Sequence, residues 1–272
     1  MNWRSEVRRF VLEDVGFGDV TTRAVLPPRK ASAVITAQEA CVVAGLREAC
    51  EAFHVHGAHP RALVKDGARV KAGTAVLRIH GEAWALLASE RTGLNLLMRM
   101  SGIATATAEL AALVAAVNKK AKVAATRKTA PGLREFDKRA VELGGGWPHR
   151  KGLFDAILIK DNHLKIVALE EALKRAKRTG LRVEVEVESV AQARVAAEAQ
   201  VDMVLLDNMK PALAARAFTA VKRLSPKTLV EVSGGLTRRN IARYAKCADL
   251  LSVGALTHSV KAIDFSMDLT PD

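Results

Sequence analysis

The sequence contains little cysteine and no long uncharged apolar segment. Its three cysteines, Cys41, Cys50 and Cys247, are far apart and form no CxxC pair, which argues against a disulfide framework and a tetrahedral zinc site. The charged N-terminus lacks the apolar core of a signal peptide, and no stretch approaches the roughly 18 apolar residues of a membrane helix. We therefore expect a cytoplasmic protein with no membrane partner.

Aromatic residues for base stacking are also scarce. A formal net charge of +13 suggests phosphate-bearing partners. However, the basic residues are spread along the chain, there is one tyrosine, and no RRM, KH or helix-turn-helix signature is present. We therefore expect no nucleic-acid partner, and attribute the charge to a small polyanionic substrate and a solvated basic surface.

The first part of the chain, up to about residue 104, has the texture of an α/β domain. Short β-like runs at 31–38 and 75–80 alternate with glycine and proline turns. Residues 63–81 resemble the hairpins of biotinyl and lipoyl carrier domains, but a carrier's modifiable lysine turn is not evident, so we interpret them as a structural β element. A helix is predicted from Ser89 to Gly102, as a joint between domains.

The second part alternates β-like runs with amphipathic helical stretches, which is typical of repeated βαβ units and a parallel sheet. Ser189 and Gln192 predict a capping box at one helix start. Six strands are fewer than a complete eight-stranded barrel, so this pattern alone fits an incomplete barrel or an open sheet. The predicted strands are 122–126, 155–160, 182–187, 202–207, 228–232 and 250–253.

Nearly every predicted strand is followed by polar residues. In a (β/α) barrel the C-terminal ends of all strands meet at one mouth, whereas an open doubly wound sheet would bring only two or three of them together. The distribution therefore favours an incomplete (β/α) barrel with one shared cavity. The polar clusters are 126–128, 160–163, Glu186, 207–208, 233–235 and 252–254.

Two late loops have the composition of phosphate-binding turns. Ser233, Gly234 and Gly235 follow one predicted strand, while Ser252 and Gly254 follow the next. Each precedes a helical stretch, so backbone N–H groups and a helix N-terminus would be available for phosphate. A lone glycine pair equally suits a tight βα turn, but two such loops in consecutive units favour phosphate binding.

The run VEVEVE places valines on one face of a strand and Glu184, Glu186 and Glu188 on the other. If the valines pack beneath helices, the glutamates point into the barrel and need a partner there, such as Mg²⁺, ribose hydroxyls or lysines. The alternative is an exposed edge strand, which is less common because parallel strands are usually covered on both faces.

A cationic group of Arg127, Lys128, His149, Arg150 and Lys160 lies in the first third of the predicted barrel. Arginine suits carboxylates through its bidentate fork, and lysine suits phosphate as a point charge. The group therefore predicts a pocket for an anion with several carboxylates and phosphates.

The histidines of HVHGAH have a spacing that only loosely resembles a metal site. We place His54 and His56 on a predicted strand face, with His59 beyond a glycine. No cysteine or carboxylate accompanies them, so we expect surface or structural histidines.

Motifs spread over almost the whole chain resemble those of the quinolinate phosphoribosyltransferase family, the nicotinate-nucleotide pyrophosphorylases (carboxylating). The chain departs from the family pattern at Pro148, where Asn is usual, and at Ala130, where a second Thr is common. The matching motifs are GDVTT (18–22), SERTGLNLL (89–97), TRKTAPGLR (126–134), GGGWPHRKGLFDAILIKDNH (144–163), VEVEV (183–187), LLDN (205–208) and SGGL (233–236).

The resemblance implies an N-terminal α/β sandwich domain, residues 1–104 joined by the tail 262–272, and an incomplete α/β barrel at 105–261. It implies a homodimer, or an assembly of dimers, in which Arg91 acts in trans in the neighbouring active site. The implied reaction joins quinolinate and phosphoribosyl pyrophosphate, with Mg²⁺ as cofactor, into nicotinate mononucleotide, pyrophosphate and CO₂ in de novo NAD biosynthesis.

The family pattern also implies roles for the cationic group. Arg127, His149 and Arg150 would hold the quinolinate carboxylates. Lys128 and Lys160 would act in catalysis, where the pyrophosphate, ribose and quinolinate meet.

Glu186 and Asp207 match the family's acidic pair near the ribose hydroxyls, and would serve in catalysis and as Mg²⁺ ligands alongside the pyrophosphate. The family's 5′-phosphate loops match Ser233, Gly234, Gly235 and Gly254.

Two other functions fit parts of the same pattern. A related phosphoribosyltransferase-like branch associated with molybdenum transport shares the fold, and a change of substrate could lie in Pro148 or Ala130. A non-catalytic phosphate-ligand binder would need neither the acidic pair nor the carboxylate forks. The intact PGLR and LIKDNH motifs favour the quinolinate enzyme.

Overall fold

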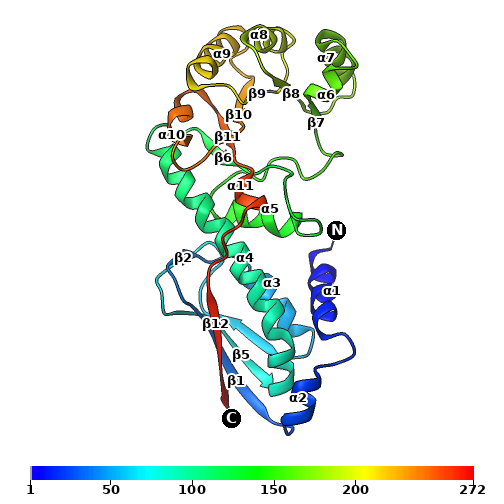
Figure 1. Ribbon diagram of the computed structural model, residues 1–272, viewed down its shortest axis with the longest axis vertical. Coiled ribbons are helices and arrows are strands. Elements are labelled where there is room, and N and C mark those ends of the chain that lie inside the picture. Colours follow the sequence, from blue (N-terminus) through cyan, green and yellow to red (C-terminus); the bar gives the residue numbers. More distant parts are fainter. Residues whose placement is uncertain (1) are drawn as a thin grey trace. The chain divides into compact units, whose positions relative to one another are not determined.

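The computed structural model describes residues 2–272 and shows two compact units (Figure 1). Unit 1 takes the chain up to Ala106, together with Glu135–Gly144 and Val260–Asp272. Unit 2 takes Thr107–Arg134 and Gly145–Ser259.

Unit 1 is built on an antiparallel sheet with strand order β12-β1-β5-β3 and a small β2-β4 pair. Strand β12 brings the C-terminal tail onto β1, pairing Phe265 with Ala37 and Pro271 with Ala31. Alternate β1 residues are buried in the core, as expected for a strand with one covered face. The elements of unit 1 are α1 (Trp3–Val15), α2 (Val20–Val25), β1 (Lys30–Ala37), β2 (Cys41–Val42), α3 (Leu46–His54), β3 (His59–Ala62), β4 (Arg69–Val70), β5 (Thr74–Glu82), α5 (Arg134–Leu143) and β12 (Phe265–Pro271). Helix α4 (Ala83–Ala115) begins in unit 1, and its residues from Thr107 onward belong to unit 2.

Helix α4 is much longer than the sequence predicted, because Gly102 does not end it. A Cβ added at Gly102 would lie 2.2 Å from the carbonyl oxygen of Lys261. Glycine is therefore needed here for close approach of the returning chain. The helix is long and apolar enough by length and composition to cross a membrane, but 56% of the relevant window is buried inside the molecule.

Helix α5 belongs to unit 1, although the sequence analysis placed it in the barrel. Arg99 of α4 donates two 2.8 Å hydrogen bonds to the buried Asp137 of α5. Arg139, also on α5, donates to Asp66 at 2.8 Å and lies near the buried Glu48. These pairings join segments that are far apart in the sequence, so no local sequence pattern predicts them.

The predicted strand face for His54 and His56 is wrong. His54 is the last residue of α3, and His56 lies in the following turn, where its Nδ1 is 3.1 Å from the Ser89 hydroxyl. In this segment the amphipathic helical pattern of α3 determines the structure, and the short alternation of apolar residues that suggested a strand does not.

Unit 2 is an incomplete (β/α) barrel, in agreement with the expected fold class. Its six parallel strands follow the order β6-β11-β10-β9-β8-β7, and each predicted strand is present within a few residues. The strands are β6 (Lys122–Ala124), β7 (Ile157–Ile159), β8 (Val183–Val187), β9 (Met203–Asp207), β10 (Leu229–Ser233) and β11 (Leu250–Ser252).

Short helices connect the strands of unit 2. Ser189 caps α8 by accepting from the Gln192 amide at 3.2 Å, so the predicted helix start is confirmed. The reciprocal bond of a capping box is not formed, because the Gln192 side chain accepts from the Glu188 amide at 2.9 Å and not from the Ser189 amide. The helices are α6 (Asp161–Leu164), α7 (Leu169–Lys177), α8 (Val190–Glu198), α9 (Pro211–Leu224), α10 (Ile241–Tyr244), a 3₁₀ turn (Ala245–Cys247) and α11 (Ala255–His258).

Candidate active site

A cavity of about 570 Å³ lies at the carboxyl ends of the unit 2 strands. It is lined by every residue to which the family pattern gives a role, except Arg91 and Gly254. Of the other polar residues expected at the mouth, 161–163, Glu184 and Glu188 do not line it. The lining residues are Ala125, Thr126, Arg127, Lys128, His149, Arg150, Leu158, Lys160, Glu186, Leu205, Asp207, Asn208, Glu231, Ser233, Gly234, Gly235 and Ser252.

Lys128 is held by its backbone in the loop after β6. Its amide donates to the Thr126 hydroxyl at 3.0 Å, and its carbonyl accepts from the buried Thr257 hydroxyl at 2.8 Å. Gly254 lies directly beside it, since a Cβ at Gly254 would be 3.2 Å from Lys128 Cδ. Gly254 therefore adjoins the cavity without lining it, and it caps the short helix α11.

Two carboxylates on neighbouring strands face the cavity. Glu186 on β8 is buried and forms an ion pair with Lys160, which follows β7. Asp207 ends β9 and accepts a hydrogen bond from the Asn208 side chain at 2.6 Å. Glu188, predicted to face inward with its neighbours, is instead exposed because β8 ends at Val187.

The loop after β10 needs its two glycines for different reasons. Gly234 has φ +99°, and a Cβ there would lie 2.1 Å from Asn208 Oδ1 and 2.9 Å from the Asn208 amide nitrogen. Gly235 has φ +58° and open space around it. The predicted helix N-terminus does not directly follow this pair, since α10 begins at Ile241, so the loop offers backbone amides and the Ser233 hydroxyl.

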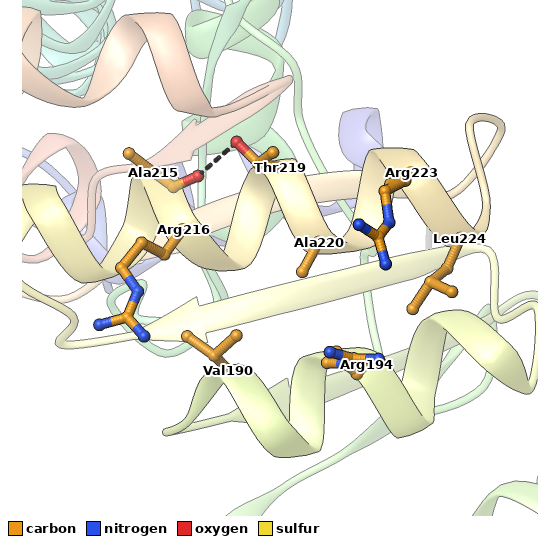
Figure 2. A pocket seen from close by; sticks show the side chains of 8 residues that line it. All are labelled: Val190, Arg194, Ala215, Arg216, Thr219, Ala220, Arg223 and Leu224. Atoms are coloured by element: carbon orange, nitrogen blue, oxygen red, sulfur yellow. Dashed lines mark hydrogen bonds between the residues drawn. The ribbon is translucent and has the colours of Figure 1, made fainter.

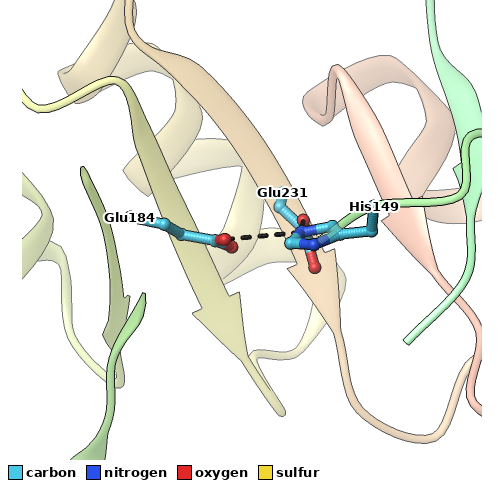
Figure 3. Close-up of side chains that lie close together, drawn as sticks. All are labelled: His149, Glu184 and Glu231. Carbon is cyan, nitrogen blue, oxygen red and sulfur yellow. Dashed lines mark hydrogen bonds and ion pairs between the residues drawn. The ribbon is translucent and has the colours of Figure 1, made fainter. Parts of the chain in front are cut away.

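His149 reaches across the barrel interior to two buried glutamates, which we call the His149 cluster (Figure 3). Its Nε2 lies 2.8 Å from Glu231 on β10 and 3.3 Å from Glu184 on β8. Its Nδ1 accepts a 2.7 Å hydrogen bond from the Arg150 amide. Sequence reasoning missed Glu231, although the alternation in Val230-Glu231-Val232 repeats the signal of β8.

The charges in this cluster are strongly coupled. Burial lowers the pKa of His149, but hydrogen bonds that the ring donates to Glu184 and Glu231, together with the charges of those carboxylates, outweigh it and raise the pKa to about 10. Burial and the charge of Glu231 raise the pKa of Glu184 to about 7. The proton can lie on the ring, as an imidazolium between two carboxylates, or on a glutamate, and the Arg150 amide can donate to Nδ1 only in the second arrangement. In either arrangement the cluster carries a net charge of −1.

The cationic side of the cavity contains unpaired polar groups. Arg127 Nε and Ser252 Oγ are buried without a hydrogen-bond partner among the described residues. Burial and the positive charge of the neighbouring Arg127 lower the pKa of Arg150, so the two guanidinium groups are close enough to repel each other. Such groups are costly when unpaired and are typical of a site completed by an anion.

Two sets of residues could in principle hold a metal ion. Within residues 2–272, His149, Glu184 and Glu231 bring ligand atoms within 4.8 Å of one another. Glu186 and Asp207 offer two carboxylates beside the proposed phosphate loops, the arrangement Mg²⁺ prefers when substrate phosphates complete its shell.

Arg91 belongs to unit 1, whereas the other predicted ligands belong to unit 2. It lies on α4 with its side chain 60% exposed, 3.9 Å from Glu90. Among the described residues 2–272, Arg91 forms no ion pair shorter than this one, so its guanidinium is not held in one direction.

A second hollow of about 440 Å³ lies between helices α8 and α9 (Figure 2). Arg194 from α8 faces Arg216 and Arg223 from α9 across small apolar residues. It contains no carboxylate or histidine among its lining residues. The strand-end cavity is therefore the candidate active site.

Comparisons with known proteins give a consistent family. The family model "Quinolinate phosphoribosyl transferase, C-terminal domain" matches residues 103–268, and its N-terminal counterpart matches residues 19–101. A probable nicotinate-nucleotide pyrophosphorylase (carboxylating) of Methanocaldococcus jannaschii is 43% identical, with 94% of this chain and 93% of the relative covered.

Two further proteins extend the comparison. The nicotinate-nucleotide pyrophosphorylase (carboxylating) of Mycobacterium leprae is 42% identical, with 98% of this chain and 96% of the relative covered. The crystal structure of NadC from Streptococcus pyogenes is similar with a TM-score of 0.92 at 38% identity, covering 98% of this chain and 96% of that one.

Proposed function

The chain belongs to the quinolinate phosphoribosyl transferase family, and from that premise we propose how its strand-end cavity carries out the reaction. The enzyme is a nicotinate-nucleotide pyrophosphorylase, a pentosyltransferase of NAD biosynthesis. It transfers the phosphoribosyl group of phosphoribosyl pyrophosphate to quinolinate, with loss of CO₂. The observation that carries the proposal is that cations, carboxylates and a glycine loop from six strand ends line one cavity.

Quinolinate binding is assigned to the cationic side of the cavity. The Arg127 and Arg150 guanidinium groups would each take one carboxylate, because the bidentate fork matches that anion. Quinolinate has two carboxylates and nicotinate has one. A pocket with two forks therefore favours quinolinate, since a buried unpaired guanidinium is costly.

The transfer step is assigned to the acidic pair and the lysines. Positive charge develops on the ribose as its bond to pyrophosphate breaks, and Glu186 and Asp207 would stabilise it. Lys128 and Lys160 would stabilise negative charge on the departing pyrophosphate. The Gly234-Gly235 loop and Ser233 would hold the 5′-phosphate.

Decarboxylation follows from the new bond to the ring nitrogen. The electron pair of the broken C–C bond remains on the ring carbon beside the positively charged nitrogen, CO₂ leaves, and that carbon takes up a proton. The protein's part is to hold the carboxylate in place, so positioning contributes more than a dedicated base.

Glu186 and Asp207 are the residues that would hold Mg²⁺ together with substrate oxygens. Two carboxylates at one edge of the cavity fit a cation that usually takes one or two protein ligands and keeps phosphates and water as the others. When bound, Mg²⁺ would neutralise charge on the pyrophosphate leaving group.

The assembly is proposed to be a homodimer, or a group of dimers, in which Arg91 enters the neighbouring active site. Its exposed guanidinium and its position on unit 1 support this assignment. A neighbouring subunit would also exclude water from the cavity, which strengthens charge contacts. Three free cysteines support a reducing, cytoplasmic location.

The function is tested by incubating the protein with quinolinate, phosphoribosyl pyrophosphate and Mg²⁺, and measuring nicotinate mononucleotide and CO₂. Formation of both products is expected, with nicotinate giving turnover far below that of quinolinate. A Lys160→Ala variant serves as the inactive control. Binding of phosphoribosyl pyrophosphate without product would instead support a phosphate-ligand binder, and comparable turnover of nicotinate would refute the assigned pocket.

A further inference from the structure

The barrel interior contains a charged layer directly beneath the mouth. Glu184 is in register with Leu158 and Met203 on its neighbours, and Glu231 with Leu205 and Leu250. Both glutamates lie on alternate strands, which is how side chains form one layer inside a barrel. Their exposures are 4% and 2%, so they are core positions that would ordinarily be apolar.

His149 fills the space between these two carboxylates. The chain before it runs beside β6, where Trp147 forms a parallel bridge with Ala124. Pro148 follows and restricts Trp147 to an extended conformation, in agreement with that bridge. His149 itself has φ +56°, a left-handed conformation that costs a residue other than glycine about 1 kcal/mol or more.

Both ring nitrogens of His149 are already used by the protein. Nε2 faces Glu184 and Glu231, and Nδ1 accepts from the Arg150 amide. Neither nitrogen is left for a substrate carboxylate in this geometry. The role that the family resemblance implied for His149, direct contact with quinolinate, is therefore better filled by Arg150.

Arg150 is fixed by the same arrangement. Its backbone is held by the His149 ring, and its guanidinium is buried and donates to the Ala156 carbonyl at 3.3 Å. A tilt of the His149 ring would move the Arg150 amide, and with it the direction of the guanidinium.

We propose that Glu184 and Glu231 are positioning residues: they hold the His149 ring in its left-handed turn and thereby orient Arg150 for one carboxylate of quinolinate. This inference rests on the proposed function. The glutamates act through His149. Glu231 also borders the strand-end cavity, whereas Glu184 does not line it.

Geometry and charge predict opposite results for the glutamates. Removing a negative charge beneath an anion site should tighten quinolinate binding if charge alone matters. Removing the acceptor for the His149 ring should weaken quinolinate binding if the position of the ring matters. A variant that keeps the acceptor but loses the charge distinguishes these two explanations.

The experiment compares Glu231→Gln with Glu231→Leu. Gln retains an oxygen that can accept from Nε2, whereas Leu has similar size and no acceptor. We expect the Gln variant to keep KM for quinolinate within about threefold of the native protein, and the Leu variant to raise it roughly tenfold or more, the scale of one lost hydrogen bond to a charged group. KM for phosphoribosyl pyrophosphate should change less than about twofold in both, because Glu231 acts through His149 on Arg150, which is assigned to quinolinate.

Controls keep the result interpretable. Glu188→Gln removes an exposed carboxylate from the same VEVEVE run and should leave both KM values unchanged. Should the Leu variant fail to fold, Glu184→Gln and Glu184→Ala form a second pair with the same expected order. Activity of the native protein tests the proposed function separately, so failure of the one is distinguishable from failure of the other.

Three results would overturn the inference. Equal KM values for quinolinate in the Gln and Leu variants, with a lowered Tm in Leu, would show a merely structural cluster. A lower KM in both would show that charge dominates. A parallel rise in KM for both substrates would show a general distortion of the cavity.

Discussion

Replacing Gly234 by alanine is expected to destabilise the protein far more than the same change at Gly235. The two glycines are adjacent, and both have positive φ, but their surroundings differ. At Gly234 the new Cβ would lie 2.1 Å from Asn208 Oδ1 and 2.9 Å from its amide nitrogen, whereas nothing lies within 4 Å at Gly235.

The magnitude follows from strain and overlap. A φ of +99° in a residue other than glycine costs about 1–3 kcal/mol, and overpacking adds about 1–3 kcal/mol, so Gly234→Ala should cost roughly 4 kcal/mol. At roughly 2–3 °C per kcal/mol for a chain of this size, Tm should fall by about 8–12 °C. Gly235→Ala, with φ +58° and no overlap, should cost about 1 kcal/mol and roughly 2–3 °C.

The change at Gly234 should also reach catalysis. Asn208 can avoid the new methyl group only by moving, and its amide donates to the Ser233 carbonyl at 2.9 Å. The Asn208 side chain donates to Asp207 at 2.6 Å, so its movement would displace a proposed catalytic carboxylate. We therefore expect kcat to fall at least tenfold in Gly234→Ala, the scale of a misplacement of about 1 Å.

The assay is a thermal unfolding scan of both variants beside steady-state kinetics with quinolinate and phosphoribosyl pyrophosphate. A Gly234→Ala protein whose Tm stays within about 2 °C of the native value would refute the overlap argument. So would an equal fall in Tm for the two variants. Native stability with lost kcat would instead place the effect on Asp207 alone.

Three further outcomes are expected. Glu186→Gln should lower kcat more than it raises KM for quinolinate, measured by steady-state kinetics, because its charge lies near the proposed ribose and metal; an unchanged kcat would make the β8 acidic face structural. Mixing Arg91→Ala with Lys160→Ala should restore up to roughly a quarter of native activity, since about half of randomly exchanged dimers carry one intact site of two; no recovery after verified exchange would remove Arg91 from the neighbouring site. Although burial opposes it, the backbone amides of Lys151 and Gly152 lower the pKa of Asp155, so its contribution to stability is present above pH 3.8 and is lost as pH falls through its folded pKa. Asp155→Asn should therefore make Tm less sensitive to acid in scans below that pH, and an unaltered acid slope would contradict this.

The strands and the cavity could be predicted because both have local signals. Alternating and apolar runs marked each barrel strand within a few residues, and polar clusters stood at the strand ends. Parallel strands in one barrel place those ends together whatever their separation in sequence. The sequence alone therefore predicts Lys160, Glu186 and Asp207 at one mouth, and all three line the cavity.

Contacts between distant segments had no such signal. The sequence predicts that a helix ends at Gly102, yet α4 continues to Ala115. Glycine is present because a Cβ at this position would collide with the Lys261 carbonyl of the returning chain. Helix α5 has an ordinary amphipathic sequence, and contacts with distant residues, such as Arg99 with Asp137 and Asp66 with Arg139, place it in unit 1.

His149 shows the division most clearly. Its neighbours in the sequence and its family motif indicated a residue that binds an anion. That indication came from residue types and their spacing along the chain. In the structure the ring lines the cavity, and its Nε2 faces Glu184 and Glu231, two residues that no local signal around His149 could indicate. Residue type and local pattern are enough to predict which chemical groups reach the barrel mouth. Which of them pair with one another follows from the fold alone, because pairing depends on the register of strands that are distant in the chain.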